Sequence, residues 1–129
     1  MKTFVLLSML LVVANVGAMV ESHPEKNEQE LKINRAVLDL KVLDNVIAVY
    51  HVKYGSYPET LTQLTKAQAN GISAQITEAA LVDPWGRPYR YDPNTTHPKT
   101  GKPLIFTHGP DPGEPKGKIT NWDSFDKKK

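Results

Sequence analysis

The longest regular pattern of apolar residues in the chain predicts one long amphipathic helix. From Ala36 to Tyr54, apolar side chains return at intervals of three and four residues, so they share one face of a helix that we expect to run from near Glu25 to Tyr54. This stripe consists of Ala36, Leu40, Leu43, Ile47, Tyr50 and Tyr54, widened by Val37, Val42, Val46 and Val49. Pro24 suits a first helical turn, and Gly55 suits a helix end. At about 1.5 Å per residue the helix is roughly 45 Å long, so its first turns are expected to project beyond the core.

A second, shorter helix is predicted after the long one. Residues 60–63, Thr-Leu-Thr-Gln, match a capping box that opens a short helix ending near Asn70-Gly71. Leu61 and Leu64 of this helix are expected to face the core. Residues 72–82 have apolar positions at near-helical spacing but lead directly into a turn, so the pattern leaves their structure open.

A tight turn is predicted where the aromatic part of the chain begins. Asp83 stands at its first position, Pro84 at its second and Gly86 at its fourth, which is typical of a type I turn. Trp85 adds a large apolar side chain at this corner, and Pro88 stiffens the segment that leaves it. We therefore expect this motif to be structural.

Short strands are predicted after the turn. Tyr89 and Tyr91 share one face of an extended segment, with Arg90 on the other face. A strand at residues 104–106 follows a loop rich in Pro, Asn and Thr, which predicts a hairpin. A third short strand is expected to end at Ile119-Thr120-Asn121-Trp122.

Residues 1–18 have the layout of a secretory signal peptide. Lys2 precedes an apolar run from Phe4 to Val13, and small residues lead up to Ala18, after which we expect cleavage. The alternative is an uncleaved anchor, because apolar character continues to Val20. The short span and its polar residues favour removal, which predicts an exported protein in the periplasm or outside the cell. An uncleaved leader would instead anchor it in the inner membrane.

Length and composition limit the remaining possibilities. The 129 residues suffice for one compact domain, which we place at residues 24–122, followed by a basic tail at 123–129. There is no cysteine, which excludes disulfides, thiolate metal sites and a cysteine nucleophile. The net charge of +2 falls to about +1 without Lys2, and the three terminal lysines account for the excess. The charge alone therefore predicts no nucleic-acid partner.

Motifs of known catalytic chemistry are missing from the sequence. There is no glycine-rich phosphate loop, no His-Glu-x-x-His and no serine elbow, so we expect no enzymatic activity. A zinc site would need the fold to bring together His97, His108 and Asp111, and no two histidines have helical ligand spacing. A stacking platform for single-stranded nucleic acid could be drawn from Arg87, Arg90, Lys99 and Lys102 beside Tyr89, Tyr91 and Phe106. Strand alternation instead favours tyrosines toward the helix and arginines toward water.

Four segments, in order, resemble the globular domain of the major pseudopilin, protein G, of the type II secretion system. Residues 83–91, Asp-Pro-Trp-Gly-Arg-Pro-Tyr-Arg-Tyr, resemble its signature, and residues 38–58 resemble its helix with a Gly-x-Tyr-Pro exit. Residues 105–111 resemble the strand that enters the family's calcium loop, and residues 119–122 resemble its Ile-Gly-Asn-Trp end. The resemblance implies an α+β fold in which a long N-terminal helix packs on a small antiparallel β-sheet. It also implies no enzymatic activity.

The chain departs from this family at its amino terminus. A pseudopilin carries about twenty apolar residues after a leader cleaved behind glycine, a length set by the bilayer. Here the apolar segment precedes Gly17, and polar residues follow it. If the leader is removed, the mature chain keeps no such stem and could not assemble through the family's helix core.

The second departure concerns the calcium loop. Asp111 matches the family's first acid, but Lys116 and Lys118 stand where the family has aspartates. Calcium needs six to eight oxygen ligands, so Asp111 and Glu114 predict no tight site, and we expect no cofactor. We expect three prolines to stiffen the loop instead, namely Pro110, Pro112 and Pro115.

These observations favour an exported, non-enzymatic pseudopilin-like protein, a component or accessory of a type II secretion (type IV pilus-like) system. It would act through contacts with secretion-system proteins and would meet a membrane only with an uncleaved leader. The alternative is a soluble periplasmic or secreted binding module that reuses the fold. The expected partner surfaces are the helix start around Leu31 and Ile33 and the loop from Gly109 to Lys118.

Overall fold

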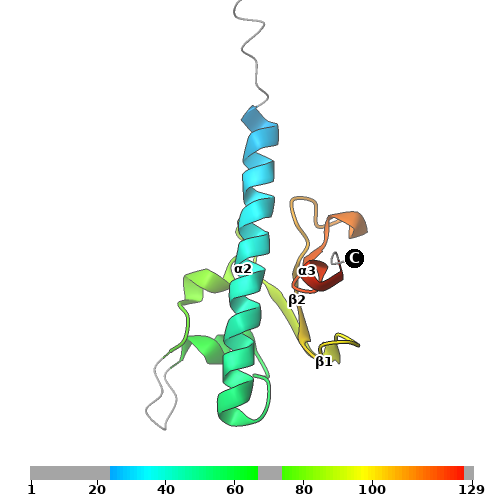
Figure 1. Cartoon of the computed structure of the whole chain (residues 1–129). Coiled ribbons are helices and arrows are strands. Elements are labelled where there is room, and N and C mark those ends of the chain that lie inside the picture. Colours follow the sequence, from blue (N-terminus) through cyan, green and yellow to red (C-terminus); the bar gives the residue numbers. More distant parts are fainter. Residues whose placement is uncertain (1–23, 67–73, 127–129) are drawn as a thin grey trace, which may run out of the picture.

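A long helix, α2 (Pro24–Tyr54), packs on a three-stranded antiparallel sheet (Figure 1). The strands are β1 (Arg90–Thr96), β2 (Pro103–Thr107) and β3 (Ile119–Thr120), in the order β1-β2-β3. The computed structural model describes residues 24–66 and 74–126, so the predicted signal peptide and the predicted cleavage site after Ala18 lie outside the described residues. The expected α+β architecture is confirmed.

The long helix has the predicted bounds. It begins at Pro24 and ends at Tyr54, where Gly55 adopts a φ of 76° and donates its N–H to the His51 carbonyl at 2.8 Å. Four residues of the predicted apolar stripe are buried, namely Ala36, Leu40, Leu43 and Ile47. The prediction that valines widen this stripe is wrong for Val42 and Val49, because both are exposed. The small sheet covers only one face of the helix.

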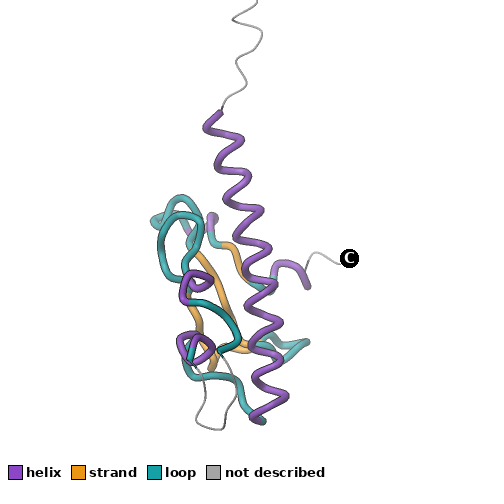
Figure 2. Tube along the Cα trace, turned by 90° about the vertical axis from the view of Figure 1, so that its left-hand side faces the viewer, coloured by secondary structure: helices purple, strands orange, loops and turns teal. Residues whose placement is uncertain are grey.

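The start of α2 extends beyond the sheet, as predicted (Figure 2). Residues 24–31 are exposed, and Trp85 ties this part to the body by donating its indole N–H to Gln29 Oε1 at 3.0 Å. None of the helices in residues 24–66 and 74–126 has the length and apolar character that crossing a bilayer requires.

The second helix is shorter and tighter than predicted. It is a 3₁₀ helix, η1 (Leu61–Thr65), and the Thr60 side chain does not cap it. The Gln63 side chain reaches back past the N-cap, because its Oε1 accepts the N–H of Glu59, the residue before Thr60, at 2.9 Å. The Thr65 hydroxyl donates to the Thr62 carbonyl, a local bond that competes with helix propagation. The helix therefore ends well before Asn70-Gly71, which lies outside the described residues.

The η1 helix contributes to the hydrophobic core, and part of the segment that follows it, for which the sequence predicted no structure, is helical. Leu61 and Leu64 are buried, as predicted. Within residues 72–82, Glu78–Leu81 form a second 3₁₀ helix, η2. The buried core gathers side chains from α2, η1, the aromatic segment and β2: Leu40, Leu43, Ile47, Leu61, Leu64, Tyr89 and Ile105.

The predicted hairpin is β1 and β2, but β1 is longer than expected. Arg90 pairs with Phe106 and Asp92 with Leu104, after which the register shifts before Thr96 pairs with Pro103. Pro93, which has no N–H to donate, lies in the irregular part of this ladder.

The third strand is shorter than predicted. β3 ends at Thr120, and Asp123 then accepts the Thr120 N–H at 3.0 Å and the Thr120 hydroxyl at 2.9 Å. These bonds turn the chain into a one-turn helix, α3 (Asp123–Asp126). Four residues of the expected tail are thus folded, and residues 127–129 lie outside the described part.

Candidate functional site

The tight turn predicted at Asp83 is present and is the corner of a narrow hairpin. The Gly86 N–H donates to the Asp83 carbonyl at 3.0 Å, and the Asp83 N–H donates to the Arg87 carbonyl at 2.7 Å. Gly86 has a φ of 82°, which a residue with a Cβ rarely adopts. Val82 and Pro88 form an antiparallel bridge on either side, so the turn sends the chain directly back.

The buried carboxylate of Asp83 joins this turn to the sheet. Its Oδ1 accepts the backbone N–H groups of Trp85 at 3.0 Å and Arg87 at 2.9 Å. Its Oδ2 accepts the hydroxyl of Thr107, a buried residue of β2, at 2.6 Å. A buried carboxylate with these donors is a structural anchor.

The two tyrosines of the motif face the helix side, as predicted. The Tyr89 hydroxyl donates to Asp39 Oδ2 of α2 at 2.9 Å, and the Tyr91 hydroxyl donates to the Pro58 carbonyl at 2.8 Å. Arg90 is exposed. The prediction that Arg87 also points toward water is wrong, because Arg87 is partly buried and its guanidinium donates to the Gly109 carbonyl.

Alkaline pH is expected to destabilise the protein through these tyrosines. Burial raises the pKa of Tyr91 to about 12, and burial with the Asp39 hydrogen bond raises the pKa of Tyr89 further. An unfolded tyrosine ionises near pH 10, so their stabilisation is complete below about pH 10 and is lost as the pH rises toward the folded-state pKa values. Between about pH 9 and about pH 11, urea unfolding should show a larger loss of stability for the wild type than for Tyr91→Phe. Equal losses would contradict this assignment.

A buried polar network joins α2 to the other end of the sheet. Asn121 accepts the Ile105 N–H at 2.9 Å and donates to Asp44 Oδ1 at 2.9 Å and to the Pro103 carbonyl at 3.0 Å. Lys102 pairs with the other Asp44 oxygen at 2.5 Å. Sequence analysis missed this network, although Asp44 lies beside Leu43 and four positions after Leu40 on the buried face.

His97 and Trp122 lie together beside this network. Their rings meet edge to face at 5.2 Å, and His97 Nδ1 accepts the N–H groups of Lys99 at 3.2 Å and Thr100 at 3.3 Å. His97 therefore holds the loop between β1 and β2. No group of three or more His, Cys, Asp or Glu side chains able to hold a metal occurs in residues 24–66 and 74–126.

The loop from Gly109 to Lys118, which the sequence analysis compared with a calcium loop, is closed by a close backbone approach. Gly109 has a φ of 72°, and a Cβ placed on it would overlap the Gly117 carbonyl oxygen. Between these glycines, the Asp111 side chain is exposed. Lys118 leaves the loop with its ammonium 3.8 Å from the centroid of the Phe106 ring.

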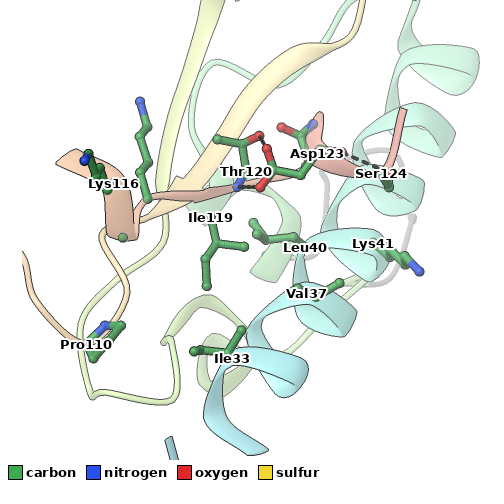
Figure 3. A pocket seen from close by; sticks show the side chains of 13 residues that line it. Ile33, Val37, Leu40, Lys41, Pro110, Lys116, Ile119, Thr120, Asp123 and Ser124 are labelled. Atoms are coloured by element: carbon green, nitrogen blue, oxygen red, sulfur yellow. Dashed lines mark hydrogen bonds between the residues drawn. The ribbon is translucent and has the colours of Figure 1, made fainter. Parts of the chain in front are cut away.

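A groove lies between α2 and the β3 side of the sheet (Figure 3). Its volume is about 590 Å³, and its apolar walls are Ile33, Val37, Leu40 and Ile119. Lys41 and Lys116 add positive charge, the Lys118 ammonium lies over the Phe106 ring, and both oxygens of the Asp123 carboxylate accept hydrogen bonds from Thr120. The groove therefore suits an apolar partner segment with acidic residues.

The groove brings together one residue and one loop that sequence analysis placed on separate partner surfaces. Ile33 lines it from α2, while Pro110 and residues 116–118 line it from the loop. Leu31 does not belong to it. Leu31 and Ile33 are two positions apart, and such residues of a helix point about 200° apart, so Leu31 lies on another face of α2.

Comparison with known protein families gives one match. A family model described as type II secretion system (T2SS), protein G, matches residues 25–123, a range that contains all three strands and nearly all of α2. No curated protein and no solved structure is significantly similar to the chain.

Proposed function

Because the chain belongs to the type II secretion system protein G family, we propose that it acts without catalysis, by binding other proteins of a secretion system. Membership of this family indicates an exported or membrane-associated protein that interacts with secretion-system components. The finer role, a structural component or accessory placed in the periplasm or at its membrane, is the part we propose.

The groove between α2 and the β3 side carries this proposal. Its walls are apolar, and two of its polar side chains hold the fold: the Ser124 hydroxyl donates to the Asn121 carbonyl, and the Asp123 carboxylate accepts the Thr120 N–H. Such a lining offers contact area and charge rather than a free base beside a nucleophile. A partner segment with apolar and acidic side chains would bury Ile33 and Ile119 and approach Lys41 and Lys116.

A secretion assay with point variants tests this function. In a host strain that lacks the chain, we expect secretion to fail and the wild type to restore it. Ile33→Glu should not restore secretion, because it places a carboxylate in the groove, whereas Val82→Glu should, because Val82 is exposed outside it. Both purified variants should melt near the wild-type temperature. Full rescue by Ile33→Glu would refute the groove as the contact site.

Normal secretion without the chain would instead refute the secretion role and favour a soluble binding module.

We also propose that the protein needs no calcium. The exposed Asp111 stands in a loop whose ends are held by Gly109 and Gly117, so its closure already has a backbone explanation. Calcium added to chelator-treated protein should leave the melting temperature unchanged within error. An upward shift of several degrees would contradict this proposal.

A further inference from the structure

The groove between α2 and the β3 side continues along the helix into a second hollow. This hollow has a volume of about 360 Å³ and shares Lys41 and Ser124 with the groove. Asn45 of α2 and Phe125 of α3 also line it. The α2 wall of the two hollows together, which we call the extended groove, therefore runs from Ile33 to Asn45. At about 1.5 Å per residue, this wall is roughly 18 Å long.

The wall on α2 has the form of a ridge. It consists of side chains that follow one another at intervals of four positions: Ile33, Val37, Lys41 and Asn45. Rows with this spacing form ridges on a helix surface, and a second helix packs by fitting such a ridge into its own groove. Three turns of a helix are about 16 Å long, which is close to the length of this wall. Both the ridge and its length therefore suit a short helix.

The backbone beside the extended groove offers little to an extended partner segment. β3, the strand at this edge of the sheet, has two residues, and its Thr120 N–H already donates to Asp123 Oδ2 at 3.0 Å. The Asn121 amide, which also lines the groove, is engaged within the fold on both its oxygen and its nitrogen. Buried backbone groups need hydrogen-bond partners, and a helix supplies its own. A helical partner therefore fits this edge better than a strand does.

The residues that line the extended groove carry a net charge of +2. The charged ones are four lysines and two aspartates: Lys41, Lys102, Lys116, Lys118, Asp44 and Asp123. Both aspartates are engaged within the fold, Asp44 by Lys102 and Asn121 and Asp123 by Thr120. Lys41 on α2 and Lys116 on the loop are exposed at opposite sides of the groove (Figure 3). A partner with carboxylates beside its apolar side chains is complementary to this arrangement.

We propose that the partner binds the extended groove as an amphipathic helix of about three turns, with carboxylates flanking its apolar side chains. This inference rests on the function proposed above, because it specifies the partner of the same site. The apolar side chains pack against Ile33, Val37 and Ile119, which are only partly buried in the chain alone. A carboxylate on the flank of the helix pairs with Lys41. The binding mode is that of a helix in a groove.

Fluorescence anisotropy with three labelled peptides tests the proposal on the purified protein, in the form in which it accumulates in cells. The first peptide has leucines at intervals of three and four with glutamates beside them. The second has the same composition in strict alternation, and the third is the first with lysine for every glutamate. We expect the first to bind at least about tenfold more tightly than either of the others. Equal binding by the second or the third peptide, or no binding of the first below about 1 mM, would overturn the proposal.

Point variants locate the bound peptide. Ile33→Glu should weaken the first peptide at least about tenfold. Lys41→Glu should weaken the first peptide and strengthen the lysine peptide, because the variant reverses the charge that each one meets. Lys99→Glu is the matched control, since Lys99 is exposed in the loop between β1 and β2 and lines neither hollow. It should change either affinity by less than about twofold, because salt screens distant charges. Unchanged binding in both Ile33→Glu and Lys41→Glu would overturn the proposal.

These results are separable from the secretion assay. If Ile33→Glu fails to restore secretion but the alternating peptide binds as well as the helical one, the secretion role stands and the helical partner is refuted. If secretion is normal without the chain but the acidic helix still binds in the groove, the helical binding mode stands and the secretion role is refuted. Sedimentation of the protein alone checks a further occupant. Self-association that Ile33→Glu abolishes would assign the groove to a second copy and overturn the proposal.

Discussion

Asp83→Ala is expected to lower the free energy of unfolding by about 3–5 kcal/mol, the largest loss we expect for a single substitution. The buried carboxylate accepts hydrogen bonds from the backbone of Trp85 and Arg87 and from the Thr107 hydroxyl. Alanine would leave these donors without their acceptor beside the buried end of β2. Urea unfolding followed by Trp fluorescence measures the loss, since Trp85 lies in the affected turn.

Asp92→Ala is the matched control for Asp83→Ala. Asp92 also accepts two backbone N–H groups and one hydroxyl, from Asn94 and Thr95, but these bonds are exposed. Water can replace an exposed acceptor, so the control should lose clearly less stability. Asp83→Asn should lie between the two, because it keeps one carbonyl oxygen. Equal losses for the two alanine variants would show that burial is not the cause.

Asn121→Ala is expected to lower the free energy of unfolding by about 3 kcal/mol. One amide side chain satisfies the Ile105 N–H, the Pro103 carbonyl and one oxygen of Asp44, and all of these bonds are buried. The substitution would therefore loosen α2, β2 and the end of β3 together. Thermal unfolding followed by circular dichroism measures the loss.

Two further variants separate hydrogen bonding from packing at Asn121. Asn121→Asp keeps the size of the side chain but sets a second carboxylate against Asp44, so it should be at least as destabilising as alanine. Asn34→Ala removes an exposed asparagine from α2 and should have little effect. If Asn121→Asp were as stable as the wild type, the hydrogen bond to Asp44 would have no measurable role.

Local patterns predicted the elements whose causes are local. The extent of α2 follows from the long run of regularly spaced apolar residues, and its end follows from Gly55. The turn at Asp83 follows from Pro84 and Gly86, which stand in the positions of a turn that they prefer. The short elements were harder. In the 3₁₀ helix η1, the Thr65 hydroxyl bonds to the Thr62 carbonyl and competes with the backbone for it, and such competition is weakly visible in a sequence.

Contacts between distant segments were not predictable from one sequence. Asp44 and Asn121 are 77 positions apart, and nothing in either neighbourhood specifies the other. Periodicity also gives the spacing of apolar residues without saying what covers them. For this reason Val42 and Val49 were assigned to the buried stripe, although they lie on the opposite face.

The groove was predictable in its parts and not as a whole. Ile33 and the loop from Gly109 to Lys118 were each expected to contact partners, but only the fold places both beside Ile119. Closeness in sequence alone groups Leu31 with Ile33 in one surface. The helical rotation between them places the two side chains on different faces of α2.

The close approach of Gly109 to Gly117 makes the intervening loop a suitable place for a reporter. Because the two glycines fix both ends, extra residues between Pro112 and Gly113 would extend into solvent without shifting β2 against β3. A fluorophore or epitope inserted there would stand at the edge of the groove. Its signal could then follow occupancy of the groove in living cells.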